Sequence, residues 1–354
     1  MYREQLGLFI VNEETSLVDA MQKIDDNANG IIFVVDNENR LCGAVSDGDI
    51  RRWILKAQPM NAKVESLMNK TPIFMRNGEI TNPYVYMRKL SINALPLVDD
   101  KDNITDIILL KEEKQDGKAK GGLEGTSVIV MAGGKGTRLY PYTKILPKPL
   151  IPIGAVPIVE RIMDSFYDYG ISDFIMTVNY RKNMIRSYFC DAEKNYNLEY
   201  VEEDKPLGTA GSICLINRKF EKPIFVTNCD ILIRTDYKKI YDYHLKEKNA
   251  LTVVTALKND IIPYGIVHSN ENGEIESIEE KPSRIYMINT GMYILNPELI
   301  DLIPEDTFFH MTHLTEAALE KGYKVGIYPV SEDSFLDMGE FEEMKRMEQK
   351  LNVE

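Results

Sequence analysis

One segment constrains the fold of this chain more than any other: a run of apolar residues that ends in a glycine-rich turn. Residues 127–132 (SVIVMA) have the length and composition of a buried β-strand, and GGKGTRL follows at 133–139. Three glycines within four positions, Gly133, Gly134 and Gly136, free the backbone of Cβ atoms, so its N–H groups can approach a phosphate. The segment therefore predicts a strand that ends in a phosphate-binding loop.

This loop differs from two common phosphate-binding patterns. No Gly-Lys-Ser/Thr sequence ends it, as in a P-loop, and its glycines lack the G-x-G-x-x-G spacing of dinucleotide-binding folds. Two cationic residues accompany it instead, namely Arg138 within the turn and Lys148 in the following PKPL at 147–150. Glycines combined with cations favour a polyphosphate, such as a nucleoside triphosphate, as the ligand.

The residues around this loop alternate between strand and helix patterns. Strands are expected at 127–132, 174–179, 198–202 and 224–227, and helices at 157–169, 184–189 and 210–217. Such alternation predicts an α/β domain with a largely parallel sheet covered by helices. Ligands of such sheets bind beyond the carboxyl ends of the strands, where the glycine-rich loop is expected to lie.

The N-terminal part repeats internally at an offset of 63 residues. VVDNENRL at 34–41 matches LVDDKDNI at 97–104, and each copy runs from an amphipathic helix through a strand and a polar turn into a second strand. A charged and then glycine-rich stretch, 111–125, follows the second copy. We therefore expect an α+β repeat pair at 1–112, a linker at 113–125 and the α/β domain at 126–354.

Charge narrows the range of partners. The chain has 42 Lys+Arg against 55 Asp+Glu, a net charge of −13, which disfavours binding to nucleic acid or to an anionic membrane. No run of 18 apolar residues and no signal pattern is present, so we expect a soluble, cytoplasmic protein.

His310 and His313 lie three residues apart. For this pair, packing or helix capping is favoured over metal binding, because no Cys or third His is near.

Together, GGKGTRL and PKPL closely resemble the signature of sugar-1-phosphate nucleotidyltransferases. Six further motifs follow in that family's order: LGTAG at 207–211, NCD at 228–230, YG at 264–265, EKP at 280–282, NTG at 289–291 and LDMG at 336–339. The resemblance covers residues 126 to about 345. It implies a Rossmann-like domain with a mostly parallel mixed sheet. It also implies a reaction that joins a nucleoside triphosphate to a sugar 1-phosphate and releases pyrophosphate.

The resemblance also implies roles for individual residues. Arg138 and Lys148 are expected to be catalytic, and Asp230 and Asp337, each placed after apolar strand residues, to bind Mg²⁺ as the cofactor. The expected nucleotide-binding residues are Gly133, Gly134, Lys135, Gly136, Thr137, Gly208 and Thr209. The expected sugar-phosphate-binding residues are Gly265, Glu280, Lys281 and Asn289. No general base is required, because the attacking phosphate oxygen is already ionised at pH 7.

An acidic stretch indicates which base the enzyme reads. Glu202, Glu203 and Asp204 lie just before the LGTAG motif, without an Asn or Gln. Guanine presents adjacent N–H donors that one carboxylate can accept, whereas uracil and thymine suit an amide side chain better. The stretch therefore favours GTP, with Glu203 as the candidate base reader, and UTP or dTTP remain the alternatives.

The sequence does not identify the sugar 1-phosphate that accepts the nucleotide. A guanylyltransferase fused to an N-terminal repeat pair resembles enzymes that supply GDP-glucosamine for legionaminic acid biosynthesis. The alternatives are mannose, heptose or N-acetylglucosamine 1-phosphate. An alternative of another class is a catalytically inactive, nucleotide-sensing regulatory subunit, against which the retained Asp230, Asp337, Arg138 and Lys148 argue.

The N-terminal repeat resembles a tandem pair of CBS domains, a module that senses adenine nucleotides. The first copy carries Ser46 and Asp49 after its second strand, and the resemblance implies that they hold ligand phosphate and ribose. The second copy has Leu109 and Glu112 at the equivalent positions, so only one adenine-nucleotide site is expected. The alternative is a pair that serves assembly only. Because CBS pairs commonly associate with one another, a homo-oligomer is expected.

Overall fold

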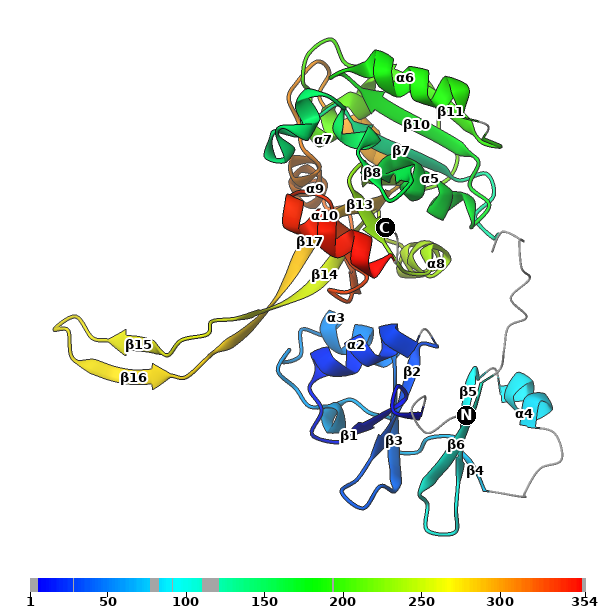
Figure 1. The fold of residues 1–354 in the computed structure, drawn as a ribbon, viewed down its shortest axis with the longest axis vertical. Helices are drawn as coiled ribbons and strands as arrows, with labels where there is room; N and C mark the ends of the chain where they lie inside the picture. The colour runs from blue at the N-terminus through cyan, green and yellow to red at the C-terminus, as the bar shows by residue number, and fades with distance from the viewer. Residues whose placement is uncertain are drawn as a thin grey trace. The chain divides into compact units, whose positions relative to one another are not determined.

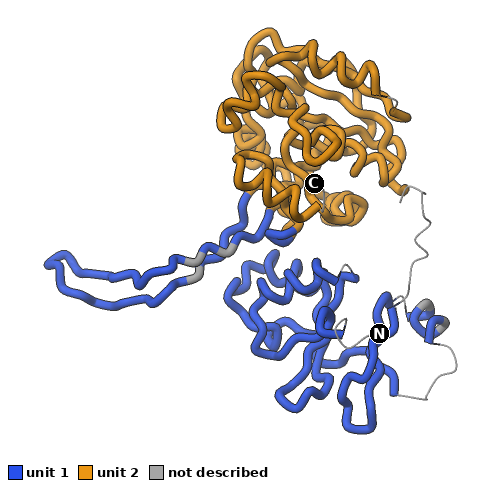
Figure 2. The backbone as a smooth tube through the Cα atoms, viewed as in Figure 1, with its two compact units in different colours: residues 1–116, 256–288, 331–333 blue, residues 117–255, 289–330, 334–354 orange. Residues whose placement is uncertain are grey.

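The computed structural model describes residues 6–27, 29–76, 83–90, 92–109, 121–192 and 194–351. The chain divides into two compact units (Figure 2). The first unit comprises residues 1–116, 256–288 and 331–333, and the second comprises 117–255, 289–330 and 334–354. The sequence repeat lies in the first unit and the glycine-rich loop in the second. Within the expected linker, residues 113–120 lie outside the described residues.

The two copies of the sequence repeat form two similar three-stranded sheets. The first copy consists of β1 (Ile10–Asn12), α2 (Leu17–Asn27), β2 (Ile31–Val35), β3 (Leu41–Ser46) and α3 (Asp47–Leu55). The second consists of β4 (Met75–Arg76), α4 (Pro83–Leu90), β5 (Ala94–Val98) and β6 (Ile104–Leu109). In each copy the first strand pairs parallel with the second, which pairs antiparallel with the third.

The turns between the last two strands of each copy match in detail. Asp36 accepts hydrogen bonds from the backbone N–H groups two and four residues later, at 2.8 and 3.0 Å. Asp99 does the same at 2.9 Å in both cases. Asn39 (φ 68°) and Asp102 (φ 65°) both adopt the left-handed conformation that Asn and Asp tolerate. The sequence repeat is therefore a structural repeat.

The second unit is built on a seven-stranded sheet (Figure 1), in the order β11-β10-β7-β12-β17-β14-β18. Its strands are β7 (Ser127–Ala132), β10 (Asp173–Val178), β11 (Asn197–Glu202), β12 (Ile224–Asn228), β14 (Leu251–Ile261), β17 (Ser283–Leu295) and β18 (Val325–Val330). The four strands from β11 to β12 are parallel, and β17 pairs antiparallel with β12. The prediction of a mostly parallel mixed sheet is confirmed.

Helices connect the strands of this unit. They are α5 (Ile158–Tyr167), α6 (Lys182–Asp191), α7 (Gly208–Gly211), α8 (Tyr237–Glu247) and α9 (Met311–Glu320), and a further helix, α10 (Phe341–Lys350), follows the strand β19 (Phe335–Asp337). The helix predicted at 210–217 is wrong in extent, because α7 is one turn and a 3₁₀ turn, Ser212–Leu215, follows it. The N–H groups of Ala210 and Gly211 donate to the carbonyl of Phe309, at 2.9 and 3.0 Å, and so bond outside the helix. No helix in the described part of the chain is long and apolar enough to span a membrane.

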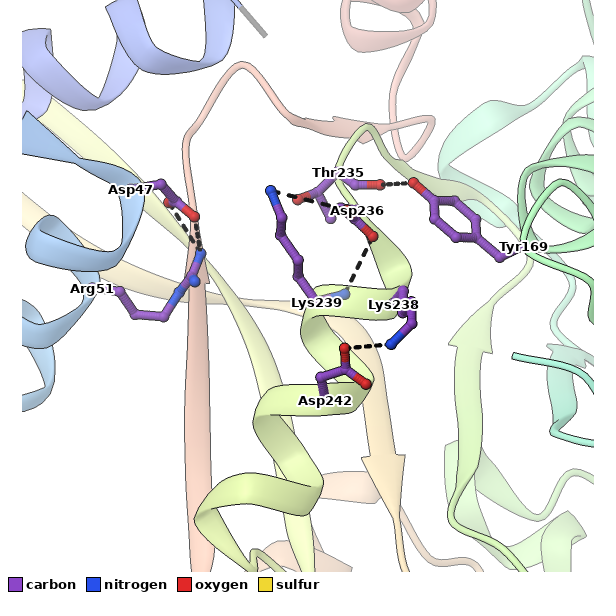
Figure 3. A network of polar contacts seen from close by, with 8 residues as sticks. All are labelled: Asp47, Arg51, Tyr169, Thr235, Asp236, Lys238, Lys239 and Asp242. Carbon is purple, nitrogen blue, oxygen red and sulfur yellow. Dashed lines mark hydrogen bonds and ion pairs between the residues drawn. The ribbon is translucent and has the colours of Figure 1, made fainter. Parts of the chain in front are cut away.

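Local side-chain contacts stabilise the first turns of two helices. The carboxylate of Asp236 accepts the N–H of Lys239 at 3.2 Å and so caps the N-terminus of α8 (Figure 3). One turn further, Lys238 forms an ion pair with Asp242 at 2.5 Å. In α3 of the other unit, Arg51 forms an ion pair with Asp47 at 2.8 Å.

Short strand pairs complete the fold. β13 (Ile231–Ile233) pairs antiparallel with β19 (Phe335–Asp337), and β8 (Pro152–Ile153) with β9 (Val156–Pro157). An antiparallel hairpin of β15 (Ile266–Ser269) and β16 (Ile275–Glu279) belongs to residues 256–288 of the first unit. We call residues 256–288 the arm.

Candidate active site

The glycine-rich loop leaves the sheet where β7, buried along its whole length, ends at Ala132. A Cβ atom on Gly133 would lie 2.5 Å from the Glu203 carboxylate, and one on Gly136 (φ 63°) would lie 3.0 Å from Lys148. Gly134, in contrast, has no described atom within 4 Å of such a position. Two glycines thus permit close packing beneath the loop, and the third leaves the backbone open to a ligand. Lys135 and Thr137, in the same loop, are both exposed.

Two aspartates meet beside this loop. Asp230 lies in the two-residue turn between β12 and β13, and Asp337 ends β19. The pairing of Ile231 with Asp337 and the hydrogen bond from the N–H of Met338 to the Asp230 carbonyl, 2.9 Å, hold the two segments together. Burial, and next the negative charge of Asp230, raise the pKa of Asp337. A proton therefore competes with a cation for Asp337 up to a higher pH than at an ordinary aspartate.

A lysine provides the positive charge nearest to this pair. The ammonium group of Lys148 contacts a carboxylate oxygen of Asp230 in an ion pair, and the two side chains are only 13% and 12% exposed. Lys148 lies in the short 3₁₀ turn Lys148–Leu150 that the PKPL sequence forms. The ion pair is thus largely screened from bulk water, which strengthens its electrostatic interaction.

A cavity of about 230 Å³ gathers residues from distant parts of the chain. Its lining includes five predicted site residues: Arg138, Thr209, Asp230, Asn289 and Asp337. The other lining residues are Asn228, Ile231, Thr290, Gly291, Tyr293 and Phe335. The described residues contain no cluster of three or more His, Cys, Asp or Glu side chains suited to a metal ion. The cavity therefore offers two carboxylates, a guanidinium and several neutral polar groups to a ligand.

Two residues that the sequence analysis missed support Asn289. Its side-chain amide donates to the hydroxyl of Tyr293 at 2.6 Å and accepts the N–H of Gly291 at 2.9 Å. Asn228 packs against Gly291, where a Cβ atom would lie 2.3 Å from the Asn228 amide nitrogen. Asn228 belongs to the NCD motif, which was the signal available for it. Tyr293 has no comparable signal, because an aromatic residue in an apolar strand is typical of core packing.

Glu203 is a buried residue rather than part of a solvated loop. Its exposed fraction is 6%, and one carboxylate oxygen accepts the N–H of Leu207 at 3.1 Å. Burial raises the pKa of this carboxyl group, and the hydrogen bond from Leu207 partly opposes that effect. Because the same carboxylate also packs on Gly133, Glu203 joins the glycine-rich loop to the start of the LGTAG segment.

The arm carries the remaining predicted sugar-phosphate residues, Gly265, Glu280 and Lys281. They belong to the first unit and are not among the residues that line the cavity. A Cβ atom on Gly265 would lie 3.0 Å from the Glu280 carboxylate, so these two positions adjoin. Lys281 adopts a left-handed backbone conformation with φ 45°, which is strained for a side chain of this kind. The roles inferred for these three residues stay predictions.

Ser46 and Asp49, the predicted adenine-nucleotide ligands, form a capping box at the start of α3. The Ser46 hydroxyl accepts the N–H of Asp49 at 3.2 Å, and the Asp49 carboxylate accepts the N–H of Ser46 at 2.9 Å. The capping box thus explains the three-residue spacing of Ser46 and Asp49 without any ligand. Of the equivalent positions in the second copy, Leu109 ends β6 and Glu112 lies outside the described residues.

Family models match both parts of the chain. A family model described as nucleotidyl transferase matches residues 127–353, and a CBS domain model matches residues 6–56. A mannose-1-phosphate guanyltransferase of Yarrowia lipolytica is 34% identical over 183 residues, and that of Saccharomyces cerevisiae is 35% identical over 184 residues. Each match covers 49% of this chain, and the chain spans about half the length of these relatives, 50% and 51%.

The chain is also similar to solved structures. The crystal structure of HddC from Yersinia pseudotuberculosis matches with a TM-score of 0.51 and 27% identity, over 64% of this chain and 99% of that one. A second structure of HddC, complexed with GMP-PN, matches with a TM-score of 0.51 and 26% identity, over the same shares. Since the nucleotidyl transferase model spans well over half of the 354 residues, the chain belongs to the nucleotidyl transferase family.

Proposed function

We propose that this protein transfers the GMP group of GTP to a sugar 1-phosphate, yielding a GDP-sugar and pyrophosphate. The observation that carries the proposal is the cavity beside the glycine-rich loop, where Asp230, Asp337 and Arg138 converge from remote segments. The relatives named mannose-1-phosphate guanyltransferase and the HddC complex with GMP-PN support guanine as the base. We also propose a cytoplasmic location, because the proposed reaction needs a supply of GTP and sugar 1-phosphate.

The acid pair fits a Mg²⁺ ion in its donor chemistry. Mg²⁺ prefers carboxylate oxygens, and it commonly takes its remaining ligands from substrate phosphates and water. Asp230 and Asp337 provide two such groups, and the charge repulsion between them is relieved when a cation binds. When bound, Mg²⁺ would supply charge neutralisation for the phosphate oxygens.

The chain's own residues would act by positioning and by electrostatic stabilisation. The sugar phosphate oxygen attacks the α-phosphorus, and the bond from that phosphorus to the pyrophosphate oxygen breaks. We assign Arg138 to the leaving pyrophosphate and Lys148 to the position between the sugar phosphate and the α-phosphate. The open backbone at Gly134 would receive the triphosphate. Cations in a partly buried site stabilise the charge that develops in the transition state more strongly than they would in water.

A pyrophosphate-release assay tests this function directly. The purified full chain is incubated with Mg²⁺, one of GTP, UTP, dTTP or ATP, and one sugar 1-phosphate. We expect release with GTP and with one member of a panel containing glucosamine, mannose, heptose and N-acetylglucosamine 1-phosphates. Glucosamine 1-phosphate is our first choice of acceptor, on the resemblance to legionaminic acid enzymes, and the named relatives make mannose 1-phosphate the second. Absence of release with every pair, from folded protein that binds GTP, would instead favour a regulatory subunit.

Base selection provides the next prediction. Replacing Glu203 by Gln removes one charge-assisted hydrogen-bond acceptor, which costs about 1.5–3 kcal/mol, so kcat/KM for GTP should fall tenfold or more. UTP and dTTP should compete better, because an amide matches their donor and acceptor pattern. Steady-state kinetics with each nucleotide provide the measurement.

The neighbouring Glu202 offers a matched control for Glu203→Gln. Its carboxylate forms ion pairs with Lys182 and Arg186 at the surface, at 2.5 and 2.6 Å. Glu202→Gln should therefore leave nucleotide selectivity within about twofold of the wild type. Equal GTP kinetics for wild type and Glu203→Gln, with both proteins folded, would place the base reader elsewhere.

We further propose that the N-terminal repeat pair binds one adenine nucleotide through Ser46 and Asp49, and that it supports a homo-oligomer. The CBS domain match at residues 6–56 covers both residues. Calorimetric titration of AMP, ADP and ATP should show binding to the wild type and none to Asp49→Ala. A saturating ligand should change turnover about five- to 150-fold, the usual range of allosteric coupling.

Asp49→Ala also removes the capping box of α3, which costs about 0.5–2 kcal/mol of folding stability. Loss of nucleotide binding in this variant therefore needs a control. Asp47→Ala is the matched control: it removes an acid from the same helical turn and an ion pair with Arg51, and leaves the cap intact. Nucleotide binding should survive in Asp47→Ala. If the wild type does not bind, or Asp49→Ala binds equally, the pair serves assembly only.

A further inference from the structure

We propose that His310 is a positioning residue for the nucleotide loop, which we define as residues 207–211 (LGTAG). The backbone N–H of Thr209 donates to the His310 Nδ1 atom at 3.3 Å. The Thr209 hydroxyl also lies 3.3 Å from that nitrogen, and it accepts the N–H of Met311 at 3.0 Å. The inference rests on the proposed function, because it gives the loop a nucleotide to bind.

The contacts determine how the histidine ring acts. A backbone N–H can only donate, so Nδ1 must present its lone pair, and the ring proton then belongs on Nε2. Because Nδ1 has one lone pair, the N–H and the hydroxyl of Thr209 share it, while the hydroxyl oxygen accepts from Met311. His310 therefore contacts Thr209 through both its backbone N–H and its hydroxyl.

The segment that carries His310 is packed tightly against the nucleotide loop. Phe309 exchanges backbone hydrogen bonds with the loop: its N–H donates to Leu207 at 2.8 Å, and its carbonyl accepts from Ala210 and Gly211. Gly208 has φ 81°, and a Cβ atom there would lie 2.6 Å from the Phe309 carbonyl oxygen. Backbone contacts thus hold the loop in place, and the His310 side chain adds the contact that orients Thr209.

Thr209 lies between His310 and the cavity of the candidate active site, because it contacts the one and lines the other. Thr209 lines the same cavity as Arg138 and Asp230, whereas His310 is not among the lining residues. The N–H of His310 donates to the His313 Nδ1 atom at 3.2 Å, which fixes the backbone from which the His310 ring projects. His310 thus acts on a bound nucleotide through Thr209 and not by direct contact.

Three substitutions at His310 separate the role of the acceptor from that of packing. His310→Asn retains an acceptor oxygen at the branch position of Nδ1, His310→Leu retains bulk without an acceptor, and His310→Ala loses both. We expect KM for GTP to rise about five- to tenfold in the Ala and Leu variants. It should stay within about twofold of the wild type in His310→Asn. KM for the sugar 1-phosphate should be unchanged in all three.

His313→Asn is the matched control, since it replaces the neighbouring imidazole and keeps an acceptor for the N–H of His310. Its KM for GTP should stay within about twofold of the wild type. Hydrogen exchange measured by mass spectrometry over residues 207–211 gives a second readout that needs no substrate. Exchange should accelerate in His310→Ala and His310→Leu and stay slow in His310→Asn.

The two readouts distinguish failure of this inference from failure of the proposed function. If the wild type releases no pyrophosphate, the proposed function fails, and the exchange pattern still decides whether His310 orders the loop. An asparagine variant as impaired as the alanine variant would overturn the inference, because the acceptor would then be irrelevant. Unchanged KM for GTP and unchanged exchange in His310→Ala would overturn it as well.

Discussion

Asp230→Asn is expected to lower kcat at least about a hundredfold, the scale of losing one major electrostatic contributor in an active site. The substitution keeps the side chain's size and removes the charge that faces Asp337 and Lys148. It leaves Lys148 without its ion-pair partner and halves the carboxylate charge available to Mg²⁺. Pyrophosphate release at saturating GTP, sugar 1-phosphate and Mg²⁺ measures the effect.

A binding measurement accompanies these kinetics. Mg²⁺ together with GTP should raise the melting temperature of the wild type and have much less effect on Asp230→Asn, because ligands stabilise the state that binds them. Asp236→Asn is a suitable control, since Asp236 caps α8 and lies outside the residues that line the cavity. Near-normal turnover of Asp230→Asn at saturating Mg²⁺ would remove Asp230 from the catalytic site.

Lys148→Met is expected to lower kcat about a hundred- to a thousandfold, with a smaller change in KM. The Lys148 side chain is 13% exposed, so its charge acts in a poorly screened environment, and methionine replaces its length without the charge. Because the charge on the reacting phosphates peaks in the transition state, the loss should appear mainly in kcat. Single-turnover rates with GTP and the accepted sugar 1-phosphate would measure it.

Lys144→Met provides the matched control for Lys148→Met. Lys144 lies in the preceding 3₁₀ turn, where its ammonium group stacks over the ring of Tyr140 at 5.4 Å. Neither lysine is among the residues that line the cavity, but Lys148 contacts Asp230 whereas Lys144 contacts Tyr140, so the turnover of Lys144→Met should equal that of the wild type. A rise in KM at unchanged kcat in Lys148→Met would mean that Lys148 contributes to substrate binding and not to the chemical step.

Local sequence patterns predicted much of this architecture. Six buried residues in β7 followed by glycines at 133, 134 and 136 indicated the strand and the loop, because burial favours apolar residues, and close packing at Gly133 and a positive φ angle at Gly136 favour glycine. The repeat at an offset of 63 predicted two similar units, and even the irregular register recurs, between Val34 and Val35 and between Leu97 and Val98. Turn chemistry and burial act over a few residues, so the sequence shows them directly.

The sequence by itself thus determined the fold class, the repeat and the types of residue proposed to carry the chemistry. Only the tertiary structure decided which of them meet. The pairing of β13 with β19 brings Asp230 beside Asp337, and packing buries Glu203 beneath Gly133. His310 reaches Thr209 across 101 residues of chain. Such contacts depend on how remote segments pack in three dimensions, and no local pattern of residue types records that packing.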